Sequence, residues 1–289
     1  MTPNPDDISV VVASRNRRQE LLRSLPRHEA PVVLVDNGST DGTAAAVRAA
    51  LPDVEVIELR RNLGAVARNV GVERVRTPYV AFADDDSWWA PGALTRAVAC
   101  FQEHPRLGLL AGRILVGEDQ RLDPVCGQMA RSPLSRSGDL PGPDVLGFVA
   151  CGAVVRREAF LAVGGFDEVV FFPGEEERVA LDLAAAGWGL AYVERVVAHH
   201  VPSPRRHAAE VRARLIERNA VLTALMRRPW PVIAGRVGRA ARSGGPAWAG
   251  ALASLPRAPR ALARRRRIPA ALEARVRLLE AAPEASGAR

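Results

Sequence analysis

Four short apolar runs alternate with stretches of helical character over residues 8–102, and this alternation restricts the fold more than any other feature. The runs read ISVVVAS at 8–14, PVVLVDNGS at 31–39, VEVIEL at 54–59 and PYVAFADDD at 78–86. Continuous apolar runs of this length, rich in β-branched residues, are typical of strands buried on both faces. Strands that alternate with helices through short connections predict an α/β fold, with a mostly parallel sheet flanked by helices.

The other elements follow from periodicity and composition. Helices are expected in the connections, at about 17–25, 41–50, 64–75 and 91–102. Residues 117–147 are rich in Gly, Pro, Ser and Arg and lack a clear period, which predicts a long irregular loop. Later elements are expected as a helix near 176–187, a strand over 190–200 and a helix over 207–226.

Polar side chains stand where three of these strands end. Ser14 and Asn16 follow the first strand, and Asp36 and Asn37 follow the second. The fourth strand ends in the carboxylates at 84–86. Ligands of open parallel sheets bind beyond the carboxyl ends of the strands. We therefore expect these residues to converge on one crevice, although they are far apart in the sequence.

Three adjacent carboxylates, Asp84, Asp85 and Asp86, end the fourth strand. They repel one another, and a divalent cation would neutralise that repulsion. Hard oxygen ligands suit Mg²⁺ or Mn²⁺, which also bind phosphate oxygens. Side chains alternate along an extended chain, so Asp84 and Asp86 share a face and Asp85 points the other way. The alternative interpretation is an acidic turn that caps the helix after Pro91.

Five segments of the chain resemble one known family. They read VVVASRNR, VDNGSTDGT with NLGAVARNVG, FADDDSWWAPGAL, GGFDEVVFFPGEEERVALDL and VVAHH, in that order between about residues 8 and 219. Their order and spacing resemble the inverting GT-A glycosyltransferases of family 2, including the rhamnosyltransferase-like members. The resemblance covers roughly three-quarters of the chain. It implies a GT-A fold, which is a Rossmann-like, mostly parallel sheet flanked by helices.

The resemblance assigns a set of residues to a nucleotide-sugar donor. Asp36 and Asn37 fall where the family contacts the base and ribose, although many members have a second Asp at the position of Asn37. Arg68 falls where a guanidinium reaches the diphosphate through paired charged hydrogen bonds. A strand-end turn is the alternative role for Asp36, and a surface salt bridge for Arg68. The donor set is Ser14, Asn16, Asp36, Asn37, Asn62, Gly64, Arg68, Asp84 and Asp85.

The same resemblance implies the metal ligands. Asp84 and Asp86 match the two Asp positions of the family's metal motif, and His199 matches the histidine after its last strand. His200 is the competitor for the histidine role. The cofactor implied is Mg²⁺ or Mn²⁺.

The catalytic base is expected among the acids at 174–177, where the family usually reads Glu-Asp. By position the base is Glu176, and Glu175 is the alternative. A helix that begins here would also favour acidic residues, because its macrodipole attracts negative charge. That structural role is the other explanation for the cluster.

The activity implied is transfer of a sugar from a nucleotide-diphosphate sugar to an acceptor hydroxyl, with inversion and metal assistance. Its setting would be the synthesis of cell-surface polysaccharide or glycoconjugate, with a saccharide or lipid-linked saccharide as acceptor. Two other classes remain open: a non-catalytic GT-A domain that binds sugar nucleotides, and a sugar-nucleotide nucleotidyltransferase. The second should have a Gly-rich phosphate loop after the first strand, and residues 13–18 contain no Gly.

The end of the chain is strongly basic. The net charge is +8, and most of the excess lies after Pro202. Residues 227–289 are rich in Pro, Gly and Arg with short helical pieces, and we interpret them as a peripheral or partly disordered extension of a domain at 1–226. A solvated basic tail explains this charge, and such clusters also suit anionic surfaces such as lipid head groups or nucleic acid. No nucleic-acid partner is expected.

Cysteine use and hydropathy predict the compartment. Cys100, Cys126 and Cys151 are few and widely spaced, which fits free thiols in a reducing cytosol. No run of about 18 apolar residues is present, and the first residues lack a signal-peptide pattern. We expect a cytoplasmic protein that contacts the inner face of the membrane peripherally.

Overall fold

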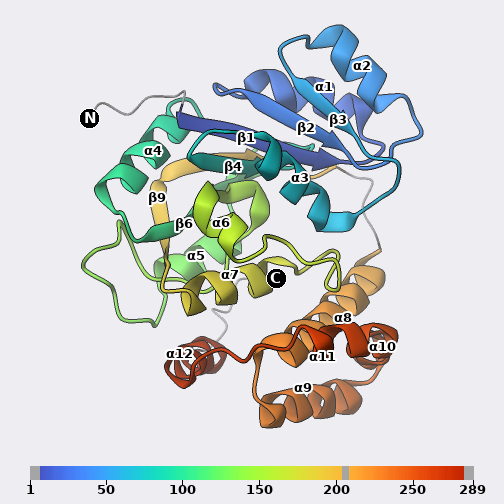
Figure 1. Cartoon of the computed structure of the whole chain (residues 1–289), viewed down its shortest axis with the longest axis vertical. Helices are drawn as coiled ribbons and strands as arrows, with labels where there is room; N and C mark the ends of the chain where they lie inside the picture. The colour runs from blue at the N-terminus through green and yellow to red at the C-terminus, as the bar shows by residue number, and fades with distance from the viewer. Residues whose placement is uncertain (1–6, 204–207, 283–289) are drawn as a thin grey trace.

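The first half of the sheet is parallel, as the strand–helix alternation predicts. The computed structural model describes residues 7–203 and 208–282. Four strands pair in parallel in the order β3–β2–β1–β4, and Figure 1 shows them side by side. Their bounds are β1 (Ile8–Ser14), β2 (Val32–Asp36), β3 (Glu55–Glu58) and β4 (Tyr79–Ala83). All four expected strands are therefore confirmed.

The second half of the sheet is mixed. β8 lies antiparallel between β4 and β6, β9 runs parallel to β6, and β5 closes the order antiparallel to β9. The short strand β7 pairs with β6. Their bounds are β5 (Ser87–Trp89), β6 (Leu107–Val116), β7 (Arg121–Leu122), β8 (Ala153–Arg156) and β9 (Gly189–His200). β5 directly follows the three carboxylates at 84–86. Its pairing with β9 therefore places this segment beside His199 and His200.

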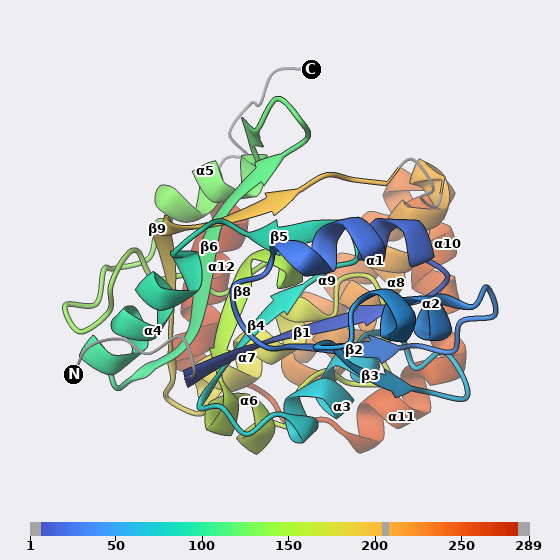
Figure 2. The same cartoon turned by 90° about the horizontal axis from the view of Figure 1, so that it is seen from above.

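Helices cover both faces of the sheet. Successive residues of β1 enter opposite apolar cores, Val11 on one face and Val10 and Val12 on the other. Figure 2 shows α1 and α3 on opposite sides of β1. The Val11 face is covered by α3 (Ala67–Arg74), α5 (Pro124–Ala130), α6 (Arg157–Ala162) and α7 (Glu176–Ala185). The other face is covered by α1 (Arg18–Ser24), α2 (Thr43–Ala50) and α4 (Ala93–Glu103).

The expectation of an irregular loop throughout 117–147 is wrong for part of that segment. Helix α5 lies within it and buries Cys126 and Met129 against the core. Its start is defined by Asp123, whose carboxylate accepts a hydrogen bond of 3.0 Å from Val125 N, and by Pro124 at the first helical position. Seven helical residues are too few to show a period within a Gly-rich segment.

The basic end of the chain is helical. Residues 227–282 form ordered helices that share apolar clusters with α8 and α7, so the expectation of partial disorder is wrong over this range. The division of the chain at residue 226 stays a prediction, although α8 packs together with α9 and α10. The helices are α8 (Ala209–Arg227), α9 (Trp230–Ser243), α10 (Gly245–Ala253), α11 (Ala258–Ala263) and α12 (Ala270–Ala281). Among the described residues, no helix combines the length and hydropathy that a membrane span requires.

Candidate active site

Two strand ends bring Ser14 and Asp36 together. Ser14 ends β1 and lies opposite Asp36, the last residue of β2, and both are buried. The Ser14 hydroxyl donates a hydrogen bond of 2.9 Å to the carboxylate of Asp85. Burial, and then the neighbouring carboxylates of Asp86 and Asp84, raise the pKa of Asp85 to about 7. Asp85 therefore faces the end of β1, which agrees with the alternation along an extended chain.

Asn37 holds the loop that precedes α3. Its side-chain oxygen accepts a hydrogen bond of 2.7 Å from Leu63 N, and its amide nitrogen donates one of 3.0 Å to Gly64 O. A carboxylate could make only the first of these bonds, because an ionised Asp has no donor. The structure thus gives a physical reason for Asn where many family members have Asp.

Three other residues of the predicted donor set also shape loops. Asn16 has a positive φ of 56°, and its side-chain oxygen accepts from Thr40 N at 2.8 Å. Asn62 accepts a hydrogen bond of 2.8 Å from Gly64 N. A Cβ on Gly64 would lie 2.6 Å from the Phe171 ring, at a φ of 62°. Glycine is therefore required where this loop meets the segment that leads to the acids at 175–177.

Arg68 connects the metal motif with the acids at the start of α7. Its side chain is buried, and it contacts Asp84 at 2.6 Å and Glu175 at 3.3 Å. The guanidinium also lies 5.6 Å from the centre of the Phe166 ring. Burial lowers the pKa of Arg68, but Asp84 and Glu175 outweigh it and raise the pKa overall. Arg68 is thus a permanently charged link between two motifs that are far apart in the sequence.

Asp84, Asp86, His200 and Cys151 gather at the end of β4. Candidate ligand atoms of Asp84, Cys151 and His200 all lie within 4.8 Å of one another. His200 Nε2 is 3.2 Å from an Asp86 oxygen, and Asp86 also accepts a hydrogen bond of 2.9 Å from Ser203 N. Carboxylate oxygens suit Mg²⁺ and Mn²⁺, and an imidazole adds a nitrogen ligand. These donors fit a divalent cation.

His200, and not His199, is among the residues that gather with Asp84 and Cys151. Adjacent residues of a strand point to opposite faces. Across the β5–β9 pairing, His199 stands opposite Trp88 and stacks on its ring at 5.4 Å. Burial, and then Arg27, lower the pKa of His199. The geometry therefore favours His200, the alternative, over His199, and the identity of the metal-binding histidine stays a prediction.

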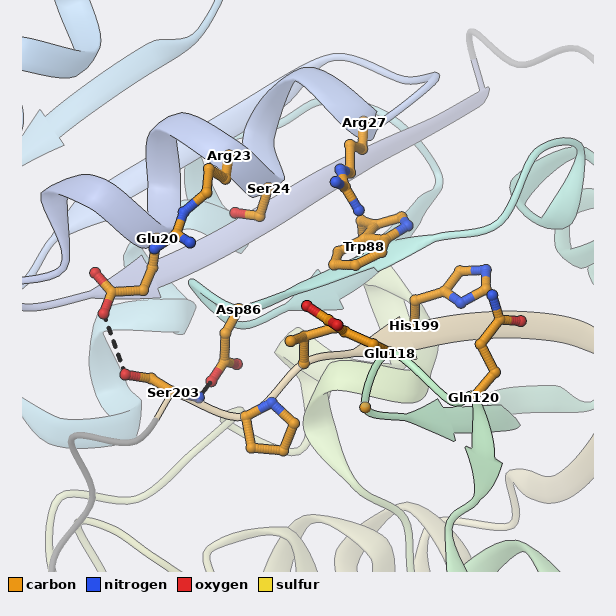
Figure 3. Close-up of a pocket in the computed structure, with 13 residues that line it drawn as sticks. Glu20, Arg23, Ser24, Arg27, Asp86, Trp88, Glu118, Gln120, His199 and Ser203 are labelled. Carbon is orange, nitrogen blue, oxygen red and sulfur yellow. Dashed lines mark hydrogen bonds between the residues drawn. The ribbon is translucent and has the colours of Figure 1, made fainter.

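A pocket of about 530 Å³ borders Asp86 on the side of His199. Figure 3 shows Arg27 pointing toward the Trp88 ring, and the guanidinium carbon lies 4.0 Å from the centre of that ring. Arg23 from α1 also lines the pocket. The cavity therefore combines an aromatic and cationic wall with one carboxylate of the metal motif.

The two candidate bases occupy different surroundings. Glu175 is 1% exposed, and one of its oxygens contacts Arg68 while the other has no hydrogen-bond partner among the described residues. Burial, and then Glu176, raise the pKa of Glu175 to about 8. Glu176 is the first residue of α7 and is partly exposed, and burial also raises its pKa. Glu176 is therefore the more accessible of the two acids.

The sequence of the chain matches a known family over its first half and beyond. A family model described as Glycosyl transferase family 2 matches residues 9–164, which is more than half of the 289 residues. The chain belongs to glycosyl transferase family 2. The matched segment contains Asp36, Arg68 and the acids at 84–86, whereas 174–177 and His200 lie beyond it.

Curated relatives of this family 2 chain come from bacteria. The N-acetylglucosaminyl-diphospho-decaprenol L-rhamnosyltransferase of Mycobacterium tuberculosis is 31% identical over 203 residues, which cover 58% of this chain and 66% of the relative. The pre-mycofactocin glycosyltransferase of the same organism is 31% identical over 202 residues, which cover 66% of this chain and 42% of the relative. The chain thus spans less than two thirds of the length of either relative.

Solved structures show that this family 2 chain has the GT-A fold. Mannosyltransferase PcManGT from Pyrobaculum calidifontis, solved with GDP-Man and Mn²⁺, has a TM-score of 0.58 at 22% identity, over 99% of this chain and 78% of that one. GalNAc-T7, solved with UDP, GalNAc and Mn²⁺, has a TM-score of 0.61 at 15% identity, over 83% of this chain and 51% of that one.

Sequence reasoning missed two residues near the metal motif of this family 2 chain. Cys151 lies in the short 3-10 helix η4 (Ala150–Gly152) and is buried, and the sequence predicts it only as one of three free thiols. Ser203 binds Asp86 through its backbone amide and Glu20 through its hydroxyl. A backbone contact across 117 residues leaves no sequence signal.

Proposed function

We propose that this chain transfers a sugar from a nucleotide-diphosphate sugar to an acceptor hydroxyl, with inversion at the anomeric carbon. The observation that carries the proposal is the buried Arg68, which contacts the metal motif through Asp84 and the base segment through Glu175. A donor-binding group and a base thereby belong to one site. Membership of family 2 supports the same activity.

Each residue has a proposed task in this reaction. Glu176 accepts the proton of the acceptor hydroxyl as the hydroxyl oxygen attacks the anomeric carbon and the nucleoside diphosphate leaves from the opposite face. Arg68 stabilises negative charge on the departing diphosphate. Asp84, Asp86 and His200 would hold Mg²⁺ or Mn²⁺, which when bound supplies positive charge to the same phosphate oxygens. Asp36, at the end of β2, would contact the base and ribose of the donor.

The proposed acceptor is a saccharide carried on a lipid, in the synthesis of cell-surface polysaccharide or glycoconjugate. The name of the mycobacterial rhamnosyltransferase specifies a decaprenol-linked acceptor for that protein. An acceptor of this kind resides in a membrane, so we propose that the chain works in the cytoplasm and contacts the inner membrane face peripherally.

A screen for ligands tests the proposed donor. UDP-, GDP- and dTDP-sugars should be compared by thermal unfolding with Mn²⁺ present. The correct donor at 100 times its Kd should stabilise the fold by about 2.7 kcal/mol, and one nucleotide should stand out. Slow hydrolysis of that donor would separate a transferase from a domain that only binds sugar nucleotides. The proposal fails if no sugar nucleotide shifts the transition.

Replacing His200 by Ala should weaken Mn²⁺ binding, while replacing His199 by Ala should not. His200 Nε2 is 3.2 Å from Asp86, whereas His199 stacks on Trp88. Loss of a residue that only hydrogen-bonds to a metal ligand already costs about 10–100-fold in metal affinity. We therefore expect a loss of about that size for His200→Ala. Titration of free Mn²⁺ by electron paramagnetic resonance, with nucleoside diphosphate present, measures it. Equal losses in both variants would contradict the assignment.

A further inference from the structure

We infer that an exposed apolar face on α10 binds an anionic lipid membrane. No charged residue occurs between Gly245 and Pro256. Trp248, Leu252 and Leu255 are 37%, 45% and 62% exposed, and we call these three residues the apolar stripe. Their spacing of four and then three residues places them on one side of a helix that continues from α10 into the 3-10 turn η5 (Leu255–Arg257).

The opposite side of α10 is already used for packing. A Cβ on Gly250 would lie 2.5 Å from Arg214 O, so the backbones of α10 and α8 approach each other closely there. Ala251 is buried in the cluster that α8 forms with α9. The apolar stripe therefore points away from α8. None of its three residues belongs to an apolar core cluster of the described residues, and exposed apolar groups of this size favour removal from water.

The charge around α10 identifies the partner. Between Trp230 and Ala282 the chain has eleven arginines and two glutamates, an excess of nine positive charges, which is more than the net +8 of the whole chain. Some arginines in this part of the molecule pair with acids of the same chain: the buried Arg228 pairs with Glu273 and Glu280, and the exposed Arg264 with Asp167. These ion pairs hold the C-terminal helices in place, so fewer arginines are left to contact an anionic partner.

Three exposed arginines flank α10 in the chain. Arg239 and Arg242 lie in the last turns of α9, and Arg260 lies in α11. None of them forms an ion pair within residues 7–203 and 208–282. We call these three the basic rim. Cations near an anionic bilayer contribute about 1 kcal/mol each, and a Trp with leucines on one face is the pattern of a helix that lies in the interface.

The position of α10 suits the proposed function. The purpose of this surface rests on that function, whereas the inferred lipid binding does not. Figures 1 and 2 place α10 toward the same end of the molecule as the carboxyl ends of β1 and β2. The segment before α7 also contacts α8, because Asn219 donates a hydrogen bond to Pro173 O. A membrane bound at α10 would therefore present lipid-linked acceptors on the side of the candidate site.

Flotation of the whole protein with liposomes tests the inference. We expect binding to vesicles that contain phosphatidylglycerol, little binding to pure phosphatidylcholine, and weaker binding at high salt. A Trp248→Gln/Leu252→Gln/Leu255→Gln variant should lose about 10-fold or more in partitioning. Leu278→Gln on α12, where Leu278 is 55% exposed, is the matched control and should bind as the parent does.

The basic rim is tested separately. Replacing Arg239, Arg242 and Arg260 by Gln should lower partitioning into phosphatidylglycerol vesicles and flatten its salt dependence. Replacing Arg48, Arg74 and Arg121 by Gln removes the same net charge from exposed positions elsewhere and should leave partitioning unchanged. Equal losses in both triple variants would overturn a localised surface.

Two further measurements test what covers the apolar stripe and whether the proposed function holds independently of it. If the parent self-associates in sedimentation and the apolar-stripe variant does not, a second copy covers the face and the inference is wrong. Stabilisation by sugar nucleotide should be the same in parent and variants, because none of these residues belongs to the candidate site. Lipid binding without any nucleotide effect would instead reject the proposed function and leave the membrane surface intact.

Discussion

Replacing Glu176 by Gln should lower kcat for sugar transfer by about 10²–10⁴-fold, the range that a positioned general base contributes. Gln keeps the size of the side chain and removes its ability to accept a proton. Glu176 begins α7 beside the buried pair of Arg68 and Glu175, so the variant should still bind the donor. Single-turnover transfer and thermal stabilisation by the sugar nucleotide measure the two properties separately.

The pH dependence of transfer follows from the same carboxylate. Burial raises the pKa of Glu176 above its ordinary 4.5, and a base works only in its deprotonated form. Activity should therefore rise with pH across the raised pKa, so the acid limb of kcat/KM lies at higher pH than an exposed glutamate would give. This limb should be absent from the residual activity of Glu176→Gln.

Glu177 provides the matched control for the base. It is the next residue of α7, and after burial its largest electrostatic influences are Arg236 and Arg228 rather than Arg68. Glu177→Gln should transfer as the parent does. Glu175→Gln tests the alternative base. If Glu175→Gln loses the acid limb and Glu176→Gln keeps it, the roles of these two residues are reversed.

The parallel half of the fold could be predicted because each of its strands is a self-contained apolar run. Val10, Val11 and Val12 enter opposite cores, which is why the run shows no polar alternation. The mixed half could not be predicted, since β8, β6 and β9 pair across long separations that leave no local pattern. Helix α10 could not be predicted from periodicity either, because a helix whose exposed side is also apolar lacks the usual polar face.

The candidate site divides in the same way. The proximity of Arg68 and Asp84 could be predicted from their segments, although their roles stay predictions. The choice between His199 and His200 depends on the register of β9 against β5. The role of Asn37 depends on Gly64, 27 residues later in the chain. Residue types and strand ends predict the chemistry of a site, and strand register determines which neighbour points into it.

Replacing Arg68 by Met should destabilise the fold by about 3–5 kcal/mol at pH 9, where Glu175 of the parent is ionised, which is the usual cost of leaving buried charges without their partner. Arg68 is 5% exposed and contacts both Asp84 and Glu175. Met fills a similar volume but cannot compensate either carboxylate. Urea unfolding measures the loss. Arg74→Met on the same helix is the matched control, because Arg74 pairs with Glu55 at an exposed site, where a salt bridge contributes about 0–1 kcal/mol.

The pH dependence of this loss identifies its cause. Arg68 lowers the pKa of Glu175, so the variant should hold the Glu175 proton to a pH above the parent's value of about 8. A carboxyl with a raised pKa binds protons more tightly in the folded state, and its folded state loses stability as pH rises from the ordinary 4.5 through the raised value. The difference between Arg68→Met and the parent should therefore begin to grow near pH 8, where the parent's Glu175 starts to lose its proton, and be larger at pH 9 than at pH 7. A difference that is constant with pH, or no larger than that of Arg74→Met, would show that Arg68 does not compensate buried carboxylates.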